Sequence, residues 1–491
     1  MRIVIGDPAN VDGVMERMGN NRFPNMGILY IFGYLRAKIG DLELYYIKGD
    51  LGLDGYLRRL EEIKPSIYGI SFASWVSDIA YKTINAVRSA FPDIPIVCGG
   101  THPTALPEEV LTRSKADICV IGEGEQTVLE LIEYFQTGKG ALSEINGIAY
   151  KENGSVKFTP PRQHLKDLGA IPLPAWDMVN FEEYEGLGYC KAKPNTVMVF
   201  SRGCPYNCVY CSNPVWRSSK PWLRLRPPED IQKEVKLLYE KGIREIWIRA
   251  DEFNSDLKWT LAVCNAIKDL NYKDLYFECN LRGDKVTEEL AKALRDINVW
   301  MINLGIETFN QRVLDGIRKQ VTVQQIIDSC TLLKKYGIDI YAWLMYYQIW
   351  QENGSLCWET PAEVDNTLRM ARNLHKEGLI DLMSWQIATP IPGAEMFHVA
   401  QKYGLIKEPY QYNVWKVGTS IPGVKERQAQ IHRLKGFLLQ AYMAYKKGRV
   451  SWQTRSNIWD RIKYVGDAVL GIVKPCFLRS SRDLECRERS L

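Results

Sequence analysis

Three cysteines crowd into one short stretch of this sequence. Cys204, Cys208 and Cys211 lie within eight residues of the segment SRGCPYNCVYCSNP, out of twelve cysteines in the chain. Thiolates at this spacing wrap one metal centre from a single loop. A structural zinc site and a ferredoxin-type cluster each take four ligands, and the nearest other cysteine, Cys190, lies upstream across a predicted strand. The loop therefore predicts an iron-sulfur cluster with one open iron, and zinc or chance clustering are the alternatives.

The elements around this loop alternate between strands and helices. Six short β-rich runs, each followed by a helical pattern, occupy residues 196–201, 245–250, 275–280, 300–307, 338–347 and 382–390. This alternation predicts a partial (β/α)6 barrel of the TIM type, in which chemistry collects at the carboxyl ends of the strands. The cysteine loop directly follows the first of these strands, where an active site is expected.

The first part of the chain predicts a second α/β unit. Short β-rich runs at residues 2–5, 42–47, 67–72, 94–100 and 117–122 alternate with helical patterns, which indicates a Rossmann-like, flavodoxin-like parallel sheet. Glycine turns follow its last two strands, in GGTHPT (residues 99–104) and GEGE (residues 122–125). These turns are either the ligand edge of the sheet or simply the way in which such sheets turn.

These patterns divide the chain into four parts. We expect a front domain over residues 1–137, a connector over 138–190, a barrel over 191–395 and a mainly helical, basic C-terminal region over 396–491. The connector is predicted to hold a hairpin with Asn153 and Gly154 at its turn, followed by proline-rich segments.

Composition is that of ordinary globular protein, with 46% hydrophobic and 25% charged residues. Neither a signal-peptide-like start nor an apolar run of about 18 residues is present. We therefore expect a cytoplasmic protein whose thiols are free or bound to metal. The net charge of +5 is uneven, because residues 425–491 hold fifteen Lys or Arg against six Asp or Glu.

The segment CPYNCVYC resembles the C-x3-C-x2-C motif of the radical S-adenosylmethionine (radical SAM) superfamily. The resemblance implies that Cys204, Cys208 and Cys211 hold a [4Fe-4S] cluster whose unique iron binds the amino and carboxylate groups of S-adenosylmethionine. Reductive cleavage then yields a 5'-deoxyadenosyl radical, and a low-potential electron donor such as flavodoxin or ferredoxin is implied as a partner. No catalytic residue is assigned beyond the cluster.

The same resemblance assigns S-adenosylmethionine contacts to the ends of the barrel strands. It implies Tyr210 beside the third cysteine, Asp251 and Glu252 as acceptors for the amino group, Arg282 for the carboxylate and Glu307 for the ribose. A salt bridge at the barrel rim is the structural alternative for each charged residue. The fifth strand lacks the family's glycine-rich adenine pattern, so no residue is assigned there.

The front domain resembles the cobalamin-binding domain of one radical SAM subgroup. Its implied cobalamin contacts are Gly99, Gly100, Thr101, Gly122 and Glu123. The Asp-x-His-x-x-Gly pattern that ligates cobalt in other cobalamin domains is absent, which puts cobalamin binding in question. His102 follows the fourth strand, and we expect it to pack or cap a turn.

The resemblance favours a cobalamin-dependent C-methyltransferase that acts on an unactivated carbon. If the basic C-terminal segment lies on a membrane, a hydrophobic or lipid-like substrate is expected. Radical cyclisation or oxidation, as in the anaerobic magnesium-protoporphyrin monomethyl ester cyclases, is the alternative chemistry. A non-catalytic corrinoid or iron-sulfur sensor is the alternative of another class.

The basic C-terminal region bears on what the protein contacts in the cell. Apolar residues recur at helical spacing from Ile458 to Ile472, so a basic amphipathic helix would either pack on the barrel or lie on an anionic membrane. No nucleic-acid partner is expected, because no binding module of that kind is recognisable.

Overall fold

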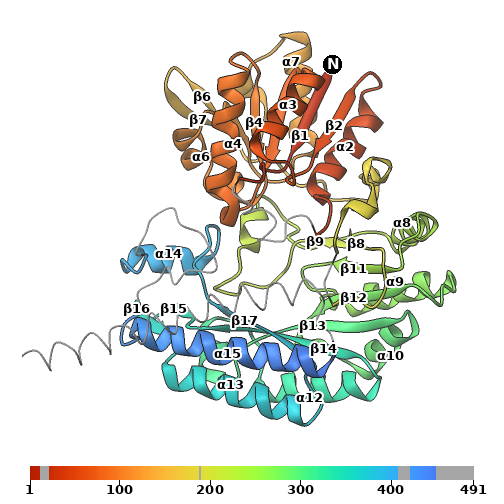
Figure 1. The fold of residues 1–491 in the computed structure, drawn as a ribbon, viewed down its shortest axis with the longest axis vertical. Helices are drawn as coiled ribbons and strands as arrows, with labels where there is room; N and C mark the ends of the chain where they lie inside the picture. Colours follow the sequence, from red (N-terminus) through yellow and green to blue (C-terminus); the bar gives the residue numbers. More distant parts are fainter. Residues whose placement is uncertain (12–21, 187–188, 407–420, 449–491) are drawn as a thin grey trace, which may run out of the picture.

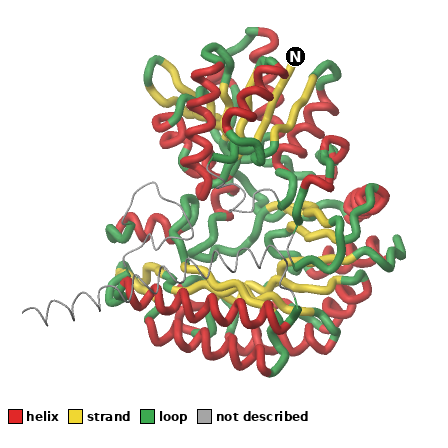
Figure 2. The backbone as a smooth tube through the Cα atoms, in the orientation of Figure 1, coloured by secondary structure: helices red, strands yellow, loops and turns green. Residues whose placement is uncertain are grey.

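The computed structural model describes residues 1–11, 22–186, 189–406 and 421–448. These residues form two large sheets, one of seven strands and one of six, in two domains stacked along the long axis of the molecule (Figure 1). Figure 2 shows helices on both faces of the upper sheet and on the outer side of the lower one.

The front domain is the predicted flavodoxin-like sheet. Its parallel strands are β1 (Arg2–Gly6), β2 (Glu43–Ile47), β3 (Ile67–Ser71), β4 (Ile96–Gly99) and β5 (Ile118–Val120). Their order is β2-β1-β3-β4-β5. The chain therefore reverses direction across the sheet between β1 and β3, and ligands of such sheets bind beyond the carboxyl ends at this switch point.

Helices cover both faces of this sheet. They are α2 (Met26–Lys38), α3 (Leu53–Ile63), α4 (Ser77–Ala90), α5 (Thr101–Ala105), α6 (Pro107–Arg113) and α7 (Glu125–Thr137). Side chains of α3, α4 and α6 pack with Val4 and Ile70 on one face, and side chains of α2 and α7 pack with Ile3 and Ile5 on the other. Successive strand residues point to opposite faces, so β1 supplies both cores.

The hairpin predicted in the connector is present and belongs to this sheet. Strands β6 (Ile148–Glu152) and β7 (Ser155–Phe158) extend it in the antiparallel direction, with β6 paired to β5. Asn153 and Gly154 form the turn, and both have positive φ, 51° and 78°. Such angles are those of the hairpin turns that favour Asn-Gly.

The six predicted barrel strands are also present. They are β8 (Asn195–Val199), β11 (Glu245–Arg249), β12 (Tyr276–Leu281), β13 (Val299–Glu307), β14 (Asp339–Tyr346) and β17 (Leu382–Ile387). All neighbours are parallel and follow one another in sequence order, so the described sheet is an open arc from β8 to β17. A two-stranded ribbon, β9 (Ser201–Arg202) with β10 (Arg224–Leu225), leads from β8 toward the front domain.

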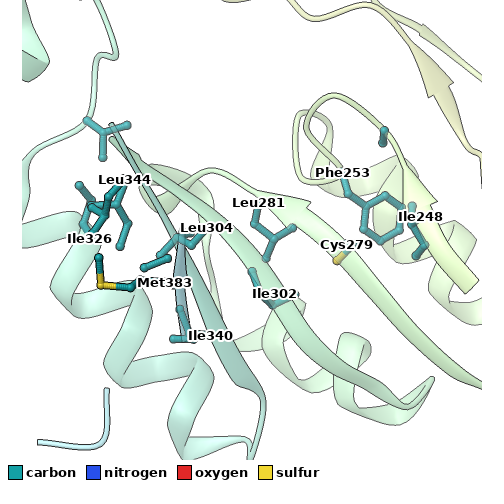
Figure 3. Close-up of a cluster of buried hydrophobic side chains, with 14 of the residues drawn as sticks. Ile248, Phe253, Cys279, Leu281, Ile302, Leu304, Ile326, Ile340, Leu344 and Met383 are labelled. Carbon is teal, nitrogen blue, oxygen red and sulfur yellow. The ribbon is translucent and has the colours of Figure 1, made fainter. Parts of the chain in front are cut away.

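The outward face of this arc carries the largest apolar core. Ile248, Cys279, Ile302, Ile340 and Met383 come from successive strands and pack under the outer helices (Figure 3). Those helices are α8 (Pro228–Glu240), α9 (Leu257–Asp269), α10 (Glu288–Asp296), α11 (Gln311–Gly316), α12 (Val323–Lys335) and α13 (Pro361–Lys376). Alternate strand residues consequently point inward, toward the barrel interior.

A second hairpin, which the sequence analysis missed, follows the fifth barrel strand. It consists of β15 (Ile349–Glu352) and β16 (Ser355–Trp358). Its turn, Asn353 and Gly354, has φ values of 47° and 79°. The tetrapeptide Glu-Asn-Gly-Ser occurs in both hairpins, at residues 152–155 and 352–355, so the same turn signal was available in the sequence.

The described C-terminal region is helical, as predicted. It holds α14 (Glu395–Lys402) and α15 (Glu426–Lys446), and α15 packs on β17 (Figure 1). The predicted amphipathic helix over residues 458–472 lies outside the described residues. Within the described ranges, none of the helices combines the length and the apolar character needed to cross a membrane.

Gly436 lets α15 lie directly on the Trp385 ring of β17. A Cβ atom at this position would overlap the indole ring. Trp385 is itself held on both sides, because it stacks on Tyr346 at 4.7 Å and donates to the His432 carbonyl at 3.1 Å. The ring therefore has little room to move.

We expect Gly436→Ala to destabilise the protein by about 1–3 kcal/mol through overpacking. This loss outweighs the gain of up to about 1 kcal/mol that alanine brings to a helix. Chemical denaturation measures the change. Gly40→Ala is the control, because a Cβ at Gly40 meets nothing within 4 Å, and equal stability of the two variants would contradict the predicted clash.

Candidate active site

A cavity of about 400 Å³ lies where the two domains meet. Its front wall comes from the turns beyond the parallel strands and from α2, and its other wall comes from the ribbon, the residues that flank the cysteine loop and the first barrel strands, while the three cysteines themselves are not among its lining residues. Among its lining residues are Tyr30, Ser71, Gly99, Gly100, Gly122, Glu123 and Gly124 in front and Arg202, Gly203, Asn213, Arg217, Arg249, Asp251 and Asn280 from the barrel side. The ligand edges of both sheets thus share one space.

The cysteine loop leaves β9 at the edge of this cavity, as predicted. Gly203 precedes Cys204 with a φ of 82°, and a Cβ there would collide with the Trp222 carbonyl. Cys204 is buried, while Cys208 and Cys211 are half-buried. Only glycine allows the sharp approach of this loop to β10, so the residue before the first cysteine sets where the thiols lie.

The donor set fits a cluster better than a single ion. Within the described residues, no three His, Cys, Asp or Glu side chains converge closely enough to hold one metal ion. A [4Fe-4S] cluster does not require this convergence, because each cysteine binds a different iron. Burial raises the pKa of Cys204 and Cys211 to about 12, so an electropositive centre is needed to keep them as thiolates.

Arg217, which the sequence analysis did not single out, supports the loop from behind. Its guanidinium donates to the Cys204 carbonyl at 2.9 Å and also to the carbonyl of Tyr206. It stacks over the Trp222 ring at 4.4 Å. An arginine six residues beyond the last cysteine has no motif of its own, so only the folded loop shows this role.

A buried charged group lies behind the loop. The Tyr210 hydroxyl donates to Glu307 at 2.8 Å, and the Lys319 ammonium contacts the same carboxylate oxygen at 3.0 Å and the Tyr210 hydroxyl at 3.1 Å. Burial lowers the pKa of Lys319, but the charges of Glu307 and Glu252 outweigh this effect and raise it above its usual value. Lys319 is therefore the cation of the group, and the sequence analysis missed it.

The backbone at Glu307 turns its side chain toward this group. The register of β13 with β14 shifts between Gly305 and Glu307, and Glu307 has a φ of 66°. A Cβ on Gly305 would stand 2.8 Å from the Lys319 ammonium nitrogen and 2.9 Å from Glu307 Oε1. A bulge and a left-handed residue of this kind cost energy and are typical of functional sites.

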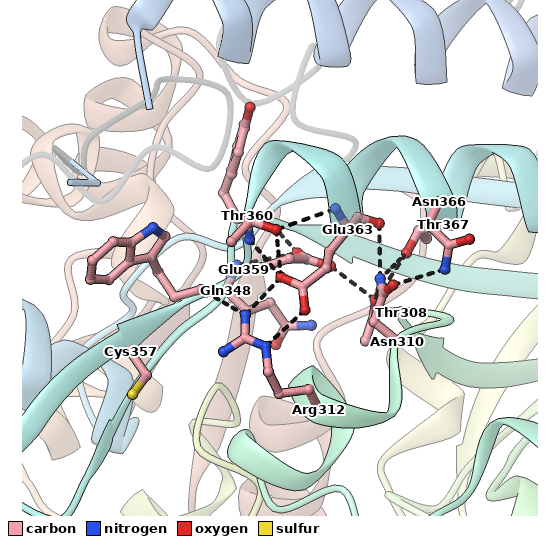
Figure 4. A network of polar contacts seen from close by, with 12 residues as sticks. Thr308, Asn310, Arg312, Gln348, Cys357, Glu359, Thr360, Glu363, Asn366 and Thr367 are labelled. Atoms are coloured by element: carbon pink, nitrogen blue, oxygen red, sulfur yellow. Dashed lines mark hydrogen bonds and ion pairs between the residues drawn. The ribbon is translucent and has the colours of Figure 1, made fainter. Parts of the chain in front are cut away.

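The residues after Glu307 are anchored by a second polar network (Figure 4). The Thr308 hydroxyl donates to Glu359 Oε1 at 2.9 Å, and Glu359 Oε2 accepts the Tyr347 N–H at 2.8 Å. Burial raises the pKa of Glu359 to about 7. Glu359 therefore ties the carboxyl ends of β13 and β14 together next to Glu307.

Asp251 and Glu252 occupy different places. Asp251 lines the cavity and accepts the Asn213 amide at 2.6 Å. Glu252 lies in the charged group behind the loop, where burial raises its pKa to about 7 against the opposing charges of Lys319 and Arg282. Its Oε2 is buried without a hydrogen-bond partner, so Glu252 has an acceptor left for a ligand.

Arg282 has protein partners on its donor groups. It donates to Asp284 at 2.9 Å and to the Lys319 carbonyl at 2.5 Å, and its guanidinium lies 3.6 Å from the Tyr206 ring centroid. Tyr206 belongs to the cysteine loop. The structure thus gives Arg282 a supporting contact with the loop, and its pairing with the methionyl carboxylate remains a prediction.

Most, but not all, of the predicted cobalamin contacts in the front domain line the cavity. Gly99, Gly100, Gly122 and Glu123 line the cavity, whereas Thr101 is not among the lining residues. Glu123 pairs with Arg224 of the ribbon at 2.5 Å. Burial opposes ionisation of Glu123, but the Arg224 hydrogen bond and the nearby arginine charges lower its pKa.

His102 is a packed core histidine, as expected. Its ring is fully buried and lies 2.8 Å from the Tyr81 hydroxyl and 3.0 Å from the Ser74 hydroxyl. Burial lowers its pKa to about 4. It does not line the cavity.

Comparison with known families agrees with this arrangement. The sequence profile of the radical SAM superfamily matches residues 198–355, and that of the B12 binding domain matches residues 19–132. The chain therefore belongs to the radical SAM superfamily and carries a B12-binding domain in front of its radical SAM core. It is a radical SAM enzyme, which removes the sensor interpretation, and its cofactors are a [4Fe-4S] cluster, S-adenosylmethionine and cobalamin.

Individual relatives cover most of the chain. An uncharacterized methyltransferase of Pyrococcus horikoshii is 28% identical over 91% of this chain and 92% of its own. The anaerobic magnesium-protoporphyrin IX monomethyl ester cyclase of Rubrivivax gelatinosus is 28% identical over 99% of this chain and 84% of its own. The radical SAM methyltransferase TsrM of Kitasatospora setae has a similar fold, with a TM-score of 0.65 at 16% identity over 83% of this chain and 76% of its own.

Removal of the Lys319 ammonium tests whether it stabilises the buried carboxylate of Glu307. We expect Lys319→Met to cost about 3–5 kcal/mol of stability, because it leaves the Glu307 carboxylate buried without its cation. Lys268→Met is the control, since Lys268 forms an exposed pair with Asp296 at 2.9 Å that contributes about 0–1 kcal/mol. Chemical denaturation of both variants compares the losses, and losses of similar size would contradict the central place of Lys319.

Proposed function

We propose that this enzyme methylates an unactivated carbon, with S-adenosylmethionine as the methyl source and cobalamin as the carrier. The observation that carries the proposal is the shared cavity, since its walls include both the glycine turns of the B12-binding domain and Gly203 and Asn213, the residues that flank the three cysteines. When bound, the cluster and cobalamin supply reductive cleavage of S-adenosylmethionine and carriage of the methyl group. One S-adenosylmethionine would supply the methyl group and leave S-adenosylhomocysteine. A second, reduced by one electron from the low-potential donor, would yield methionine and, with a hydrogen atom taken from the substrate carbon that receives the methyl group, 5'-deoxyadenosine.

The chain's own residues would bind and orient these groups. Cys204, Cys208 and Cys211 would hold the cluster, with Arg217 fixing the carbonyls of their loop. Asp251 lies in the cavity with one carboxylate oxygen on Asn213, which supports a role in accepting an ammonium. Gly99, Gly100 and Gly122 offer backbone at the front wall, where a side chain would fill space that a corrin needs.

The charged group of Tyr210, Glu307 and Lys319 would face the ribose side of S-adenosylmethionine. Glu307 has Tyr210 and Lys319 on one oxygen, Oε1. Its other oxygen can accept hydroxyl groups of a ligand. We also propose that Glu252 accepts the amino group and that Arg282 pairs with the carboxylate of the methionyl part.

Radical cyclisation or oxidation is the second candidate. It is favoured by the relative named as an anaerobic magnesium-protoporphyrin IX monomethyl ester cyclase, which matches 99% of this chain. A hydrophobic or lipid-like substrate, a flavodoxin or ferredoxin as electron donor and contact of the basic tail with a membrane also remain proposals.

The decisive experiment compares the products of S-adenosylmethionine. Protein made without oxygen and with cobalamin should yield both S-adenosylhomocysteine and 5'-deoxyadenosine under a low-potential reductant, because each comes from a separate S-adenosylmethionine. Liquid chromatography with mass spectrometry quantifies both. Formation of 5'-deoxyadenosine alone by corrinoid-loaded protein would refute methyl transfer and leave cyclisation or oxidation.

Substitution of two different cysteines tests the assignment of the cluster ligands. Cys208→Ala should reduce 5'-deoxyadenosine to background, because it removes one of the proposed cluster ligands, while corrinoid binding in the front domain persists. Cys357→Ala is the matched control, since Cys357 is a half-buried thiol on β16 outside the cysteine loop. Cleavage that survives Cys208→Ala would contradict the assignment of the cluster.

A further inference from the structure

The barrel floor of the cavity is formed by the inward face of two neighbouring strands. Ile248 of β11 pairs with Cys279 of β12, and both pack outward in the apolar core. The next residue of each strand, Arg249 and Asn280, therefore points inward. Both line the cavity, and neither has a role in the assignments above.

Arg249 differs from the other arginines of the cavity. Arg202 is held by Glu125 at 2.6 Å, Arg224 by Glu123 at 2.5 Å, and Arg217 by the carbonyls of the cysteine loop. The Arg249 side chain forms no hydrogen bond or ion pair with the described residues, and its guanidinium lies 4.6 Å from the Trp247 ring centroid. Stacking on an aromatic face leaves the donors at the guanidinium edge available.

Neither of the two carboxyl groups near Arg249 forms an ion pair with its guanidinium. Asp251 and Glu278 act on Arg249 only through their charge, at distances beyond an ion pair. Asp251 accepts the Asn213 amide at 2.6 Å. Glu278 is fully buried and receives the Tyr189 hydroxyl at 3.2 Å and the Asn303 amide at 2.5 Å.

Burial raises the pKa of Glu278 to about 8. It is therefore mainly protonated at neutral pH and supplies a hydroxyl donor instead of a negative charge. Of the two nearby carboxyl groups, only Asp251 then opposes the Arg249 charge, and it does so without forming an ion pair with the guanidinium.

Three buried polar atoms beside Arg249 also lack partners. They are Trp247 Nε1, Glu278 Oε2 and Asn280 Oδ1, all on the inward face of β11 and β12. A buried polar atom without a hydrogen bond costs about 1–3 kcal/mol. Trp247 Nε1 is a donor, and a protonated Glu278 can donate from Oε2, so an oxyanion beside the Arg249 guanidinium can complete the hydrogen bonding of both. Asn280 Oδ1 is an acceptor, so Asn280 would meet such a group through its amide nitrogen.

We propose that Arg249 and Asn280 form a subsite for an oxyanion, a carboxylate or a phosphate-type group, and that this group belongs to the substrate. This inference rests on the proposed function, because it names the class of substrate that the same cavity would take. The guanidinium edge binds the two oxygens of such a group with parallel hydrogen bonds. The substrate is therefore an acid and not a neutral hydrocarbon.

The remainder of the barrel interior suits an apolar or planar substrate body. Tyr341 lies 5.2 Å from Tyr189 and 6.1 Å from Trp343, measured between ring centroids. Trp343 is 38% exposed although it belongs to a barrel strand. These rings lie outside the lining of the cavity, so a substrate body against them would extend along the barrel interior from an acidic head on Arg249, which describes an amphiphilic acid.

Inorganic phosphate is the probe that tests the subsite. The full chain, with cluster and cobalamin, is titrated at constant ionic strength, and phosphorus NMR line widths report the binding. Arg249→Met should weaken phosphate binding roughly ten-fold or more, as expected for loss of a charged hydrogen-bonding partner, and Arg249→Lys should recover part of it. Arg58→Met is the control, because Arg58 is an exposed arginine on α3.

A second titration identifies the owner of the oxyanion. Phosphate that stays bound to the wild-type protein at saturating S-adenosylmethionine supports the substrate, whereas displacement assigns the subsite to the methionyl carboxylate and overturns the proposal. Equal phosphate binding by wild type and Arg249→Met would also overturn it. These outcomes need no turnover, so they are independent of whether S-adenosylhomocysteine is formed.

Discussion

The contact between the ribbon arginines and the GEGE turn is the interaction on which the cavity depends. Arg224 is almost completely buried and donates two hydrogen bonds, of 2.5 and 2.8 Å, to the Glu123 carboxylate. Arg202 forms an ion pair with Glu125 at 2.6 Å. Each sheet alone presents its carboxyl edge to solvent. These ion pairs hold the two edges facing each other, and their burial makes the attraction stronger than at a surface.

The second requirement is a rigid support for the cysteine loop. Arg217 and Arg282 contact this loop from two sides, one through backbone carbonyls and the other through the Tyr206 ring. Lys319 joins the support to Glu307 and Tyr210. Positive charges behind a loop of thiolates lower the cost of their ionisation, so one set of side chains serves both the position and the charge of the loop.

Much of this organisation could be read from sequence patterns. The cysteine spacing, the six strand-helix units and the five front strands predicted the order of the elements, because hydrophobic periodicity and turn residues act over short distances. The hairpin at Asn353 and Gly354 was missed although its turn repeats an earlier tetrapeptide. Lys319 and Arg217 were missed for a different reason, since a lone basic residue in a loop has no pattern until folding brings it to its partners.

The sequence by itself determined the kind of chemistry, because a three-cysteine motif after a strand restricts the ligands that a loop can hold. It also determined the local conformation of the hairpin turn at Asn153 and Gly154, where both residues have positive φ. Only the tertiary structure decided which charged residues are engaged and which are available. Arg282 and Arg249 are each the residue at or just beyond the carboxyl end of a barrel strand, yet one is paired and the other is not. That difference arises from the residues packed around them, which come from distant parts of the chain and leave no trace in local spacing.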